Sequence, residues 1–151
     1  MIVAGIGAQS TATAQDIVEA VTDCCQRAGM ALTELGVLAG RNRAKTVTDL
    51  VAAASELHNK RLAQHKNATI PNKLPVNPGV GILVFSVAQL QQEVGRCVTH
   101  SERSMAATGV PCVAEAAALA AAGPDGMLLL PRVAFARVTC ALAIAPGGTA
   151  T

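Results

Sequence analysis

Glu115 is the residue whose type and surroundings most favour chemistry. It stands near the start of an alanine-rich segment that predicts a helix over residues 113–122, ended by Gly123. Two interpretations are open. A carboxylate in the first turn stabilises the helix dipole, whereas a carboxylate beside small side chains in a cleft can act as a general base or accept hydrogen bonds from a ligand. We take Glu115 as the candidate catalytic residue.

A second candidate site lies near the N-terminus. Gly5 and Gly7 close an apolar run, and Gln9, Ser10 and Thr11 follow them. Glycines let backbone amides approach a ligand, and the helix expected next would present free N–H groups to an anion. A third glycine is missing, so this is not a dinucleotide-binding fingerprint. The alternative is a tight strand-to-helix turn capped by hydroxyl side chains.

The sequence predicts neither a metal site nor a bound cofactor. The five cysteines are odd in number and include no Cys-x-x-Cys pair, so they are expected to be small buried side chains rather than disulfides or zinc ligands. His58, His65 and His100 have no neighbouring ligand set. Ser101, beside His100, is by default a helix N-cap.

Composition limits the classes of partner. The chain has 151 residues, enough for one domain, with a net charge of +2, no Trp or Tyr and two Phe. So few aromatic rings and so weak a charge argue against a nucleic-acid partner. No apolar run is long enough to cross a membrane and no signal peptide is indicated, so a cytoplasmic protein is expected.

Periodicity predicts alternating strands and helices. Apolar runs at residues 2–6, 35–39, 82–85, 127–130 and 137–145 indicate strands, and helices are expected over 13–28, from about 46 to 57, near 90–94, over 101–109 and over 113–122. Thr13 and Asp16 have the spacing of a capping box. We predict a three-layer α/β/α domain with a mixed sheet of about five strands, spanning residues 1–146, and a flexible tail over 147–151. The buried stripe of the second helix is expected to be Val47, Leu50, Val51, Ala54 and Leu57.

The composition of residues 58–81 predicts a long basic loop. Prolines and glycines punctuate this stretch, and between Leu57 and Gln92 there is no acidic residue. Two interpretations remain open, a solvated loop or a cationic surface for an anionic ligand. The basic residues that would form that surface are Lys60, Arg61, Lys66 and Lys73.

Three motifs in order give the chain a family resemblance. Gly-Val-Pro at 109–111 leads into Val-Ala-Glu-Ala-Ala-Ala-Leu at 113–119; the first strand ends in Gly-Ile-Gly; and the last strand carries Val-Thr with alternating small residues at 138–143. This arrangement resembles the CobE and CbiG C-terminal family of cobalamin biosynthesis. The resemblance covers residues 1–57 and 82–146.

The resemblance adds candidate ligand contacts at Lys45, Ser101, Cys112 and Val113. Lys45 with Asp49 approximates a family pattern of a lysine followed by acidic residues, although Asp49 is also explained as a helix cap. Two departures stand out. The Cys-Arg-Arg that usually follows the first glycines is replaced by Ala-Gln-Ser-Thr at 8–11, and Cys112 replaces the usual serine.

The resemblance implies a role in corrin-ring synthesis, for which we weigh three hypotheses. The chain binds or passes on a precorrin or cobyrinic-type intermediate; or it is a hydrolase that opens the ring lactone of a cobalt-precorrin with release of acetaldehyde, Glu115 activating water; or it is a non-catalytic subunit that docks on another enzyme of the pathway. The implied partners are a corrin or precorrin molecule and other enzymes of the cobalamin pathway.

Overall fold

The computed structural model describes residues 1–65 and 79–146, with the side chains of 61–65 left out. Five strands form one mixed sheet in the order β3-β2-β1-β5-β4. β1 (Ile2–Ala8), β2 (Leu35–Arg41) and β3 (Gly81–Phe85) are parallel, whereas β5 (Val138–Ile144) runs antiparallel to both β1 and β4 (Met127–Ala134). The predicted five-stranded mixed sheet is confirmed.

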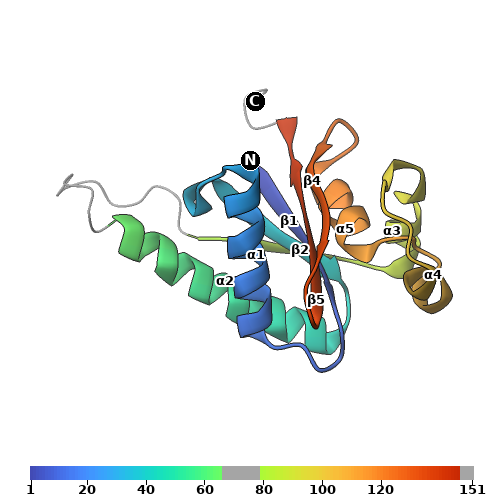
Figure 1. Ribbon diagram of the computed structural model, residues 1–151, viewed down its shortest axis with the longest axis horizontal. Coiled ribbons are helices and arrows are strands. Elements are labelled where there is room, and N and C mark those ends of the chain that lie inside the picture. The colour runs from blue at the N-terminus through green and yellow to red at the C-terminus, as the bar shows by residue number, and fades with distance from the viewer. Residues whose placement is uncertain (66–78, 147–151) are drawn as a thin grey trace.

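Helices cover both faces of the sheet. α1 (Ala14–Ala28) and α2 (Ala44–His65) pack together on one face, and α5 (Val113–Ala122) lies across the other, with α3 (Val87–Gln91) beside it. α4 (Glu102–Thr108) lies at the outer edge on the α5 side (Figure 1). Short 3₁₀ turns lie at Leu32–Glu34 and Val94–Arg96. The expected three-layer α/β/α architecture is therefore confirmed.

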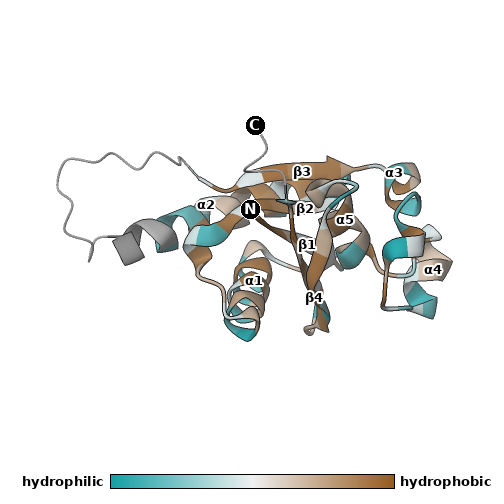
Figure 2. Ribbon diagram, turned by 90° about the horizontal axis from the view of Figure 1, so that it is seen from above, coloured by the Kyte–Doolittle hydropathy of each residue, from teal (hydrophilic) through white to brown (hydrophobic). Residues whose placement is uncertain are grey.

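The two faces of the sheet carry separate hydrophobic cores. Beneath α1 and α2 the core holds large aliphatic side chains, among them Ile17, Leu50 and Leu57, whereas beneath α5 it is built mainly from alanine. The strands between them are strongly hydrophobic (Figure 2). All five cysteines are free thiols, four of them buried, as expected. Among the described helices none is long and apolar enough by itself to span a membrane, and the one pair that passes jointly, α4 with α5, is bent by 69°.

α1 begins and ends where the sequence predicts. The Thr13 side chain accepts the N–H of Asp16, the Asp16 carboxylate accepts the N–H of Thr13, and Gly29 ends the helix in the left-handed conformation. Both terminal signals are local, so no tertiary contact is needed to place them.

Replacing Thr13 with alanine is expected to lower the free energy of unfolding by about 1 kcal/mol, because the N-cap loses its acceptor. Chemical denaturation measures the change. The matched control is Ser10→Ala, an exposed position just before the cap. Equal losses in the two variants would contradict the capping role.

α2 departs from its prediction in length and in orientation. It begins at Ala44 and continues through His65, so the loop predicted over 58–81 is wrong for its first eight residues, and β3 takes its last one; residues 66–78 lie outside the described residues. Val51 is 53% exposed, contrary to prediction, and Asp49 pairs with Lys45 instead of capping the helix. The buried stripe is Thr46, Leu50, Ala53, Ala54 and Leu57.

Gly5 and Gly7 both lie inside β1 and not in a ligand-binding turn: Gly5 falls within the predicted strand, and Gly7 joins it because β1 continues to Ala8, two residues past its predicted end. A Cβ on Gly5 would stand 1.9 Å from the carbonyl oxygen of Ala114 and 2.8 Å from the Cβ of Ala118. The missing side chain therefore lets α5 lie directly on the backbone of β1. The small alanine side chains of α5 allow the same close contact between the helix and the strand.

Candidate binding cleft

An open cleft lies where the parallel strands end. Its cavity measures about 490 Å³, within the range of small-molecule sites, roughly 300–1,000 Å³. In Figure 1 this end of the sheet points away from the N-terminus of the chain. The carboxyl ends of parallel strands are the usual place for ligands in open α/β sheets, because the loops there are free to present side chains.

Five segments far apart in the chain form the walls. The end of β1, the connection from β2 into α2, α4, the start of α5 and the β4–β5 hairpin all contribute. The lining residues are Ile6, Gly7, Ala8, Gln9, Arg41, Arg43, Thr46, Ser101, Arg103, Ser104, Ala107, Thr108, Cys112, Val113, Arg132, Ala134, Phe135, Ala136, Arg137, Val138 and Thr139.

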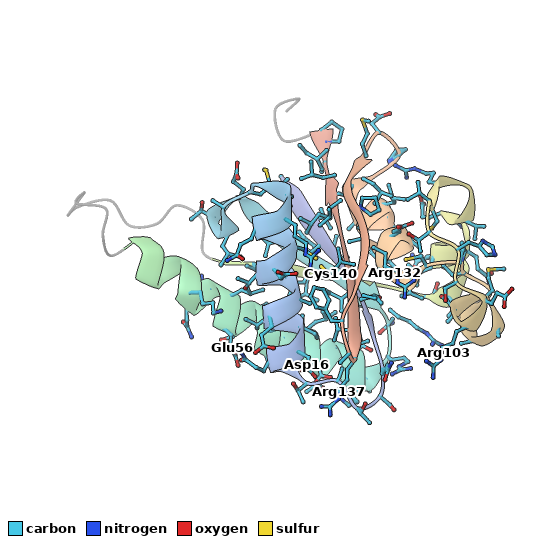
Figure 3. All side chains as sticks on the ribbon, viewed as in Figure 1. Asp16, Glu56, Arg103, Arg132, Arg137 and Cys140 are labelled. Atoms are coloured by element: carbon cyan, nitrogen blue, oxygen red, sulfur yellow. The ribbon has the colours of Figure 1, made fainter. Side chains whose placement is uncertain are left out.

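Five of the eight arginines in the chain line this cleft. Arg41 ends β2, Arg43 precedes α2, Arg103 belongs to α4, Arg132 to β4, and Arg137 to the turn between β4 and β5. Figure 3 labels three of them, Arg103, Arg132 and Arg137. A guanidinium presents a rigid planar set of donors that matches a carboxylate in two-point contact.

The arginines of the cleft have no acidic partner in the described part of the chain. The ion pairs found there join Arg27 to Asp23, Lys45 to Asp49 and Arg96 to Glu93, and none of these residues lines the cleft. The lining itself contains no Asp or Glu. Five positive charges are thus presented to one cavity without internal neutralisation, which strongly favours an anion with several charges.

The lining offers little for acid–base chemistry. Besides the arginines its only titratable side chain is Cys112, and no histidine or lysine is among the lining residues. Burial raises the pKa of the Cys112 thiol to about 11, so the thiol is protonated at neutral pH. The described cleft can hold and orient an anion, but it does not present a free general base.

Glu115 lies behind the cleft wall, fully buried. Its Oε1 accepts the backbone N–H groups of Val98 (2.8 Å) and Thr99 (2.9 Å). Its Oε2 accepts the hydroxyl of Thr99 (2.6 Å) and the backbone N–H of Arg132 (3.0 Å). Burial alone raises the pKa of Glu115, but these hydrogen bonds outweigh it and hold that pKa below its ordinary value. The carboxylate is therefore ionised and fully engaged by donors of the protein.

The structure brings together part of the predicted site. Gly7, Gln9, Ser101, Cys112 and Val113 line one cleft, so the first strand and the start of α5 do meet there. Ser101 is also the N-cap of α4, and its side chain accepts the N–H of Ser104.

The other predicted site residues do not line the cleft. Gly5 packs against α5, Ser10 and Thr11 are exposed in the turn before α1, and Glu115 is buried behind the wall. The Nζ of Lys45 binds the Ala12 carbonyl (2.6 Å) and Asp49, and so fastens α2 to the turn before α1.

The sequence reasoning missed the five arginines and looked for positive charge in residues 58–81. Of the four basic residues proposed there, Lys60 is exposed on α2, the side chain of Arg61 is not described, and Lys66 and Lys73 lie outside the described residues. One signal was available: Arg41 and Arg43 come shortly after the strand predicted at 35–39, and the carboxyl ends of parallel strands meet at one edge of a sheet.

Metal binding gains no support from the described residues, where no three side chains of His, Cys, Asp or Glu come together in a group that could hold an ion. His58 lies near Gly79 at the side of α2, and His100 is exposed.

Residues 2–143 match the protein family described as "Cobalamin synthesis G C-terminus". The match therefore spans nearly the whole chain, from the first strand to the last. A comparison with curated protein sequences gave no match.

Solved structures share the fold. CobE, described as a protein from the cobalamin (vitamin B12) biosynthetic pathway, superposes with a TM-score of 0.75 at 24% identity, over 95% of this chain and 89% of CobE. The cobalamin biosynthesis protein ChiG of Agrobacterium tumefaciens gives 0.63 at 27% identity, over 97% and 99%. A putative cobalamin biosynthesis protein G homolog of Sulfolobus solfataricus gives 0.61 at 19%, over 95% of this chain and 36% of the homolog.

Proposed function

Since this chain belongs to the CbiG C-terminal family of cobalamin biosynthesis, we propose that it binds a polycarboxylate tetrapyrrole of that pathway, a precorrin or cobyrinic-type intermediate, and holds it or passes it on. The observation that carries the proposal is the convergence on one cleft of five arginines that have no acidic partner among the described residues. Corrin precursors carry several acetate and propionate arms, and each arm is a suitable partner for one guanidinium.

The apolar part of the cleft suits the ring itself. Partly exposed Val113 and Phe135 give the lining hydrocarbon surface, and the buried side chains of Ile6 and Val138 lie behind it. A flat macrocycle can lie against such a surface while its charged arms reach outward to the guanidinium groups. A lining that contains both apolar side chains and five arginines suits a large ring with charged arms better than a small inorganic anion.

The hydrolase hypothesis needs a group that activates water. Glu115 was the candidate, but its two oxygens already accept four hydrogen bonds, and it does not line the cleft. A carboxylate held ionised by four donors is a weak proton acceptor. We therefore favour binding over lactone opening; release of acetaldehyde from a lactone precursor by the purified protein would reverse that preference.

Titration with hydrogenobyrinic acid tests the proposal, and the absence of Trp and Tyr leaves the protein nearly transparent in the near ultraviolet. The corrinoid absorption is expected to shift on binding. Arg132→Gln and Arg41→Gln are each expected to weaken binding about tenfold, since each removes a charged hydrogen bond worth about 1.5 kcal/mol or more. Raising the salt concentration weakens wild-type binding, because it screens the attraction between the charges.

Two controls make the result specific. Arg27→Gln removes the same charge from the exposed side of α1, where Arg27 pairs with Asp23, and is expected to leave affinity unchanged. The same macrocycle with its arms converted to amides is expected to bind much more weakly. Absence of any spectral shift with hydrogenobyrinic acid would refute the proposal, and equal affinity for the amidated ring would remove the arginines as its basis.

A further inference from the structure

Two walls of the cleft are joined by one buried side chain. Through Oε2 Glu115 accepts the backbone N–H of Arg132 on β4, and through Oε1 it accepts those of Val98 and Thr99, in the segment that leads into α4. Arg132 and Arg103 lie on the two walls held in this way. The carboxylate thus connects, through backbone groups, two segments that each carry an arginine of the cleft lining.

The α4 wall depends on few attachments. No residue of α4 is buried. Besides the bonds to Glu115, three hydrogen bonds fasten this wall to neighbouring segments. They run from the Ser101 N–H to the Pro111 carbonyl (2.9 Å), from the Ser104 hydroxyl to the Val110 carbonyl (2.6 Å) and from the Gln91 amide to the Thr108 carbonyl (3.0 Å). With so little apolar area holding it, the position of the wall depends on hydrogen bonds, and the carboxylate of Glu115 makes three of them.

We propose that Glu115 is a positioning residue for anion recognition: it acts through Arg132 and Arg103, setting the separation of the two arginine-bearing walls, and does not contact the ligand. This inference rests on the proposed function. A positioning role differs from a purely structural one in two ways. Loss of the carboxylate must change the affinity of the folded protein for the ligand, and this change must depend on the two arginines.

Glu115→Gln is expected to break the hydrogen bond to one wall of the cleft and to keep the bonds to the other. Glutamine keeps the shape of the side chain but replaces one acceptor oxygen with an NH₂ donor. Its remaining oxygen can still accept the N–H groups of Val98 and Thr99, and the Thr99 hydroxyl can rotate to accept from the NH₂ group. The N–H of Arg132 then faces a donor, so the bond to β4 is the one that is lost.

A double-mutant cycle on the affinity for hydrogenobyrinic acid tests the coupling. Glu115→Gln and Arg132→Gln are each expected to raise the dissociation constant about tenfold. If Glu115 acts through Arg132, the dissociation constant of the double variant is also raised only about tenfold, and not about a hundredfold. Once the Arg132 guanidinium is gone, loss of the Glu115 carboxylate has no further effect on binding. An unchanged affinity for Glu115→Gln, or independent effects that multiply, would overturn the inference.

A milder variant covers the case in which Glu115→Gln does not fold. Thr99→Val removes only the hydroxyl bond to Oε2, and is expected to weaken binding about threefold and to be non-additive with Arg103→Gln. Thr13→Ala is the matched control: it destabilises the protein at the N-cap of α1, a residue that does not line the cleft, and should leave affinity unchanged.

The two proposals fail in different ways. If wild-type protein gives no spectral shift with hydrogenobyrinic acid, the proposed function fails and this inference falls with it. If wild-type protein binds but both cycles are additive, only the positioning role is refuted.

Discussion

Replacing Gly5 with alanine is expected to destabilise the protein by about 3 kcal/mol, the upper end for overpacking a core. The new Cβ would stand 1.9 Å from the Ala114 carbonyl oxygen and 2.6 Å from the Ala118 backbone nitrogen. Both atoms belong to the backbone of α5, so the contact cannot be relieved by a change of rotamer. The helix must move away from β1 as a unit. This movement also loosens the packing of the alanine-rich core between α5 and the sheet.

Chemical denaturation of Gly5→Ala beside Gly36→Ala measures this effect. Gly36 lies in the neighbouring strand β2, and a Cβ there would come close to the Met1 side chain alone, which can swing aside; the Ile2 carbonyl oxygen is at an ordinary contact distance of 3.8 Å. Gly36→Ala is therefore expected to change stability by less than about 1 kcal/mol. A loss at Gly5 as small as that at Gly36 would show that α5 is not held in direct contact with β1.

Glu115→Ala is expected to lower the free energy of unfolding by about 3–5 kcal/mol, because four hydrogen-bond donors lose their common acceptor in a buried setting. Thermal or urea unfolding followed by far-ultraviolet circular dichroism gives the difference. Glu19→Ala on the exposed side of α1 is a matched control, expected to change stability by less than about 0.5 kcal/mol.

The same carboxylate makes stability depend on pH in a defined direction. Because its pKa is lower in the folded protein than the ordinary value of 4.5, Glu115 contributes stability that is present above that value and is lost as the pH falls through the folded pKa. The wild-type protein is therefore expected to lose stability below about pH 4.5, and the difference from Glu115→Gln shrinks there. A difference between the two that stays constant down to pH 2 would contradict this account.

Local signals in the sequence were sufficient for most elements. Thr13 with Asp16, Ser101, and the glycines 29, 109 and 123 mark helix ends that the structure confirms, because caps depend on side chains within a few residues. The buried stripe of α2 was predicted correctly at Leu50, Ala54 and Leu57, but Thr46 and Ala53 are buried in place of Val47 and Val51. Val47, Leu50, Val51 and Ala54 have helical spacing, but so do Thr46, Leu50, Ala53 and Leu57, and only packing against the sheet selects one face.

Glu115 was recognised from its setting, but its role was not. Nothing local indicates that its partners are Val98, Thr99 and Arg132, each 16 or 17 residues away in the chain. The glycine pattern of β1 was likewise interpreted as a ligand turn, whereas the side chain missing at Gly5 makes room for α5. In both cases the residue type marked a position with a special role. Only the tertiary structure showed which groups contact it.

By itself, then, the sequence determined the order and type of the elements, the alternation that gives a three-layer domain, and the motifs of the family. The cleft was decided only by the tertiary structure. Its five arginines come from the β2–α2 connection, α4 and the β4–β5 hairpin, and apart from the position of Arg41 and Arg43 after a strand nothing local distinguishes them from solvated surface arginines. They become one site because parallel strands end at the same edge of the sheet and α4, α5 and the β4–β5 hairpin close around it, which is a property of topology and not of any short stretch of chain.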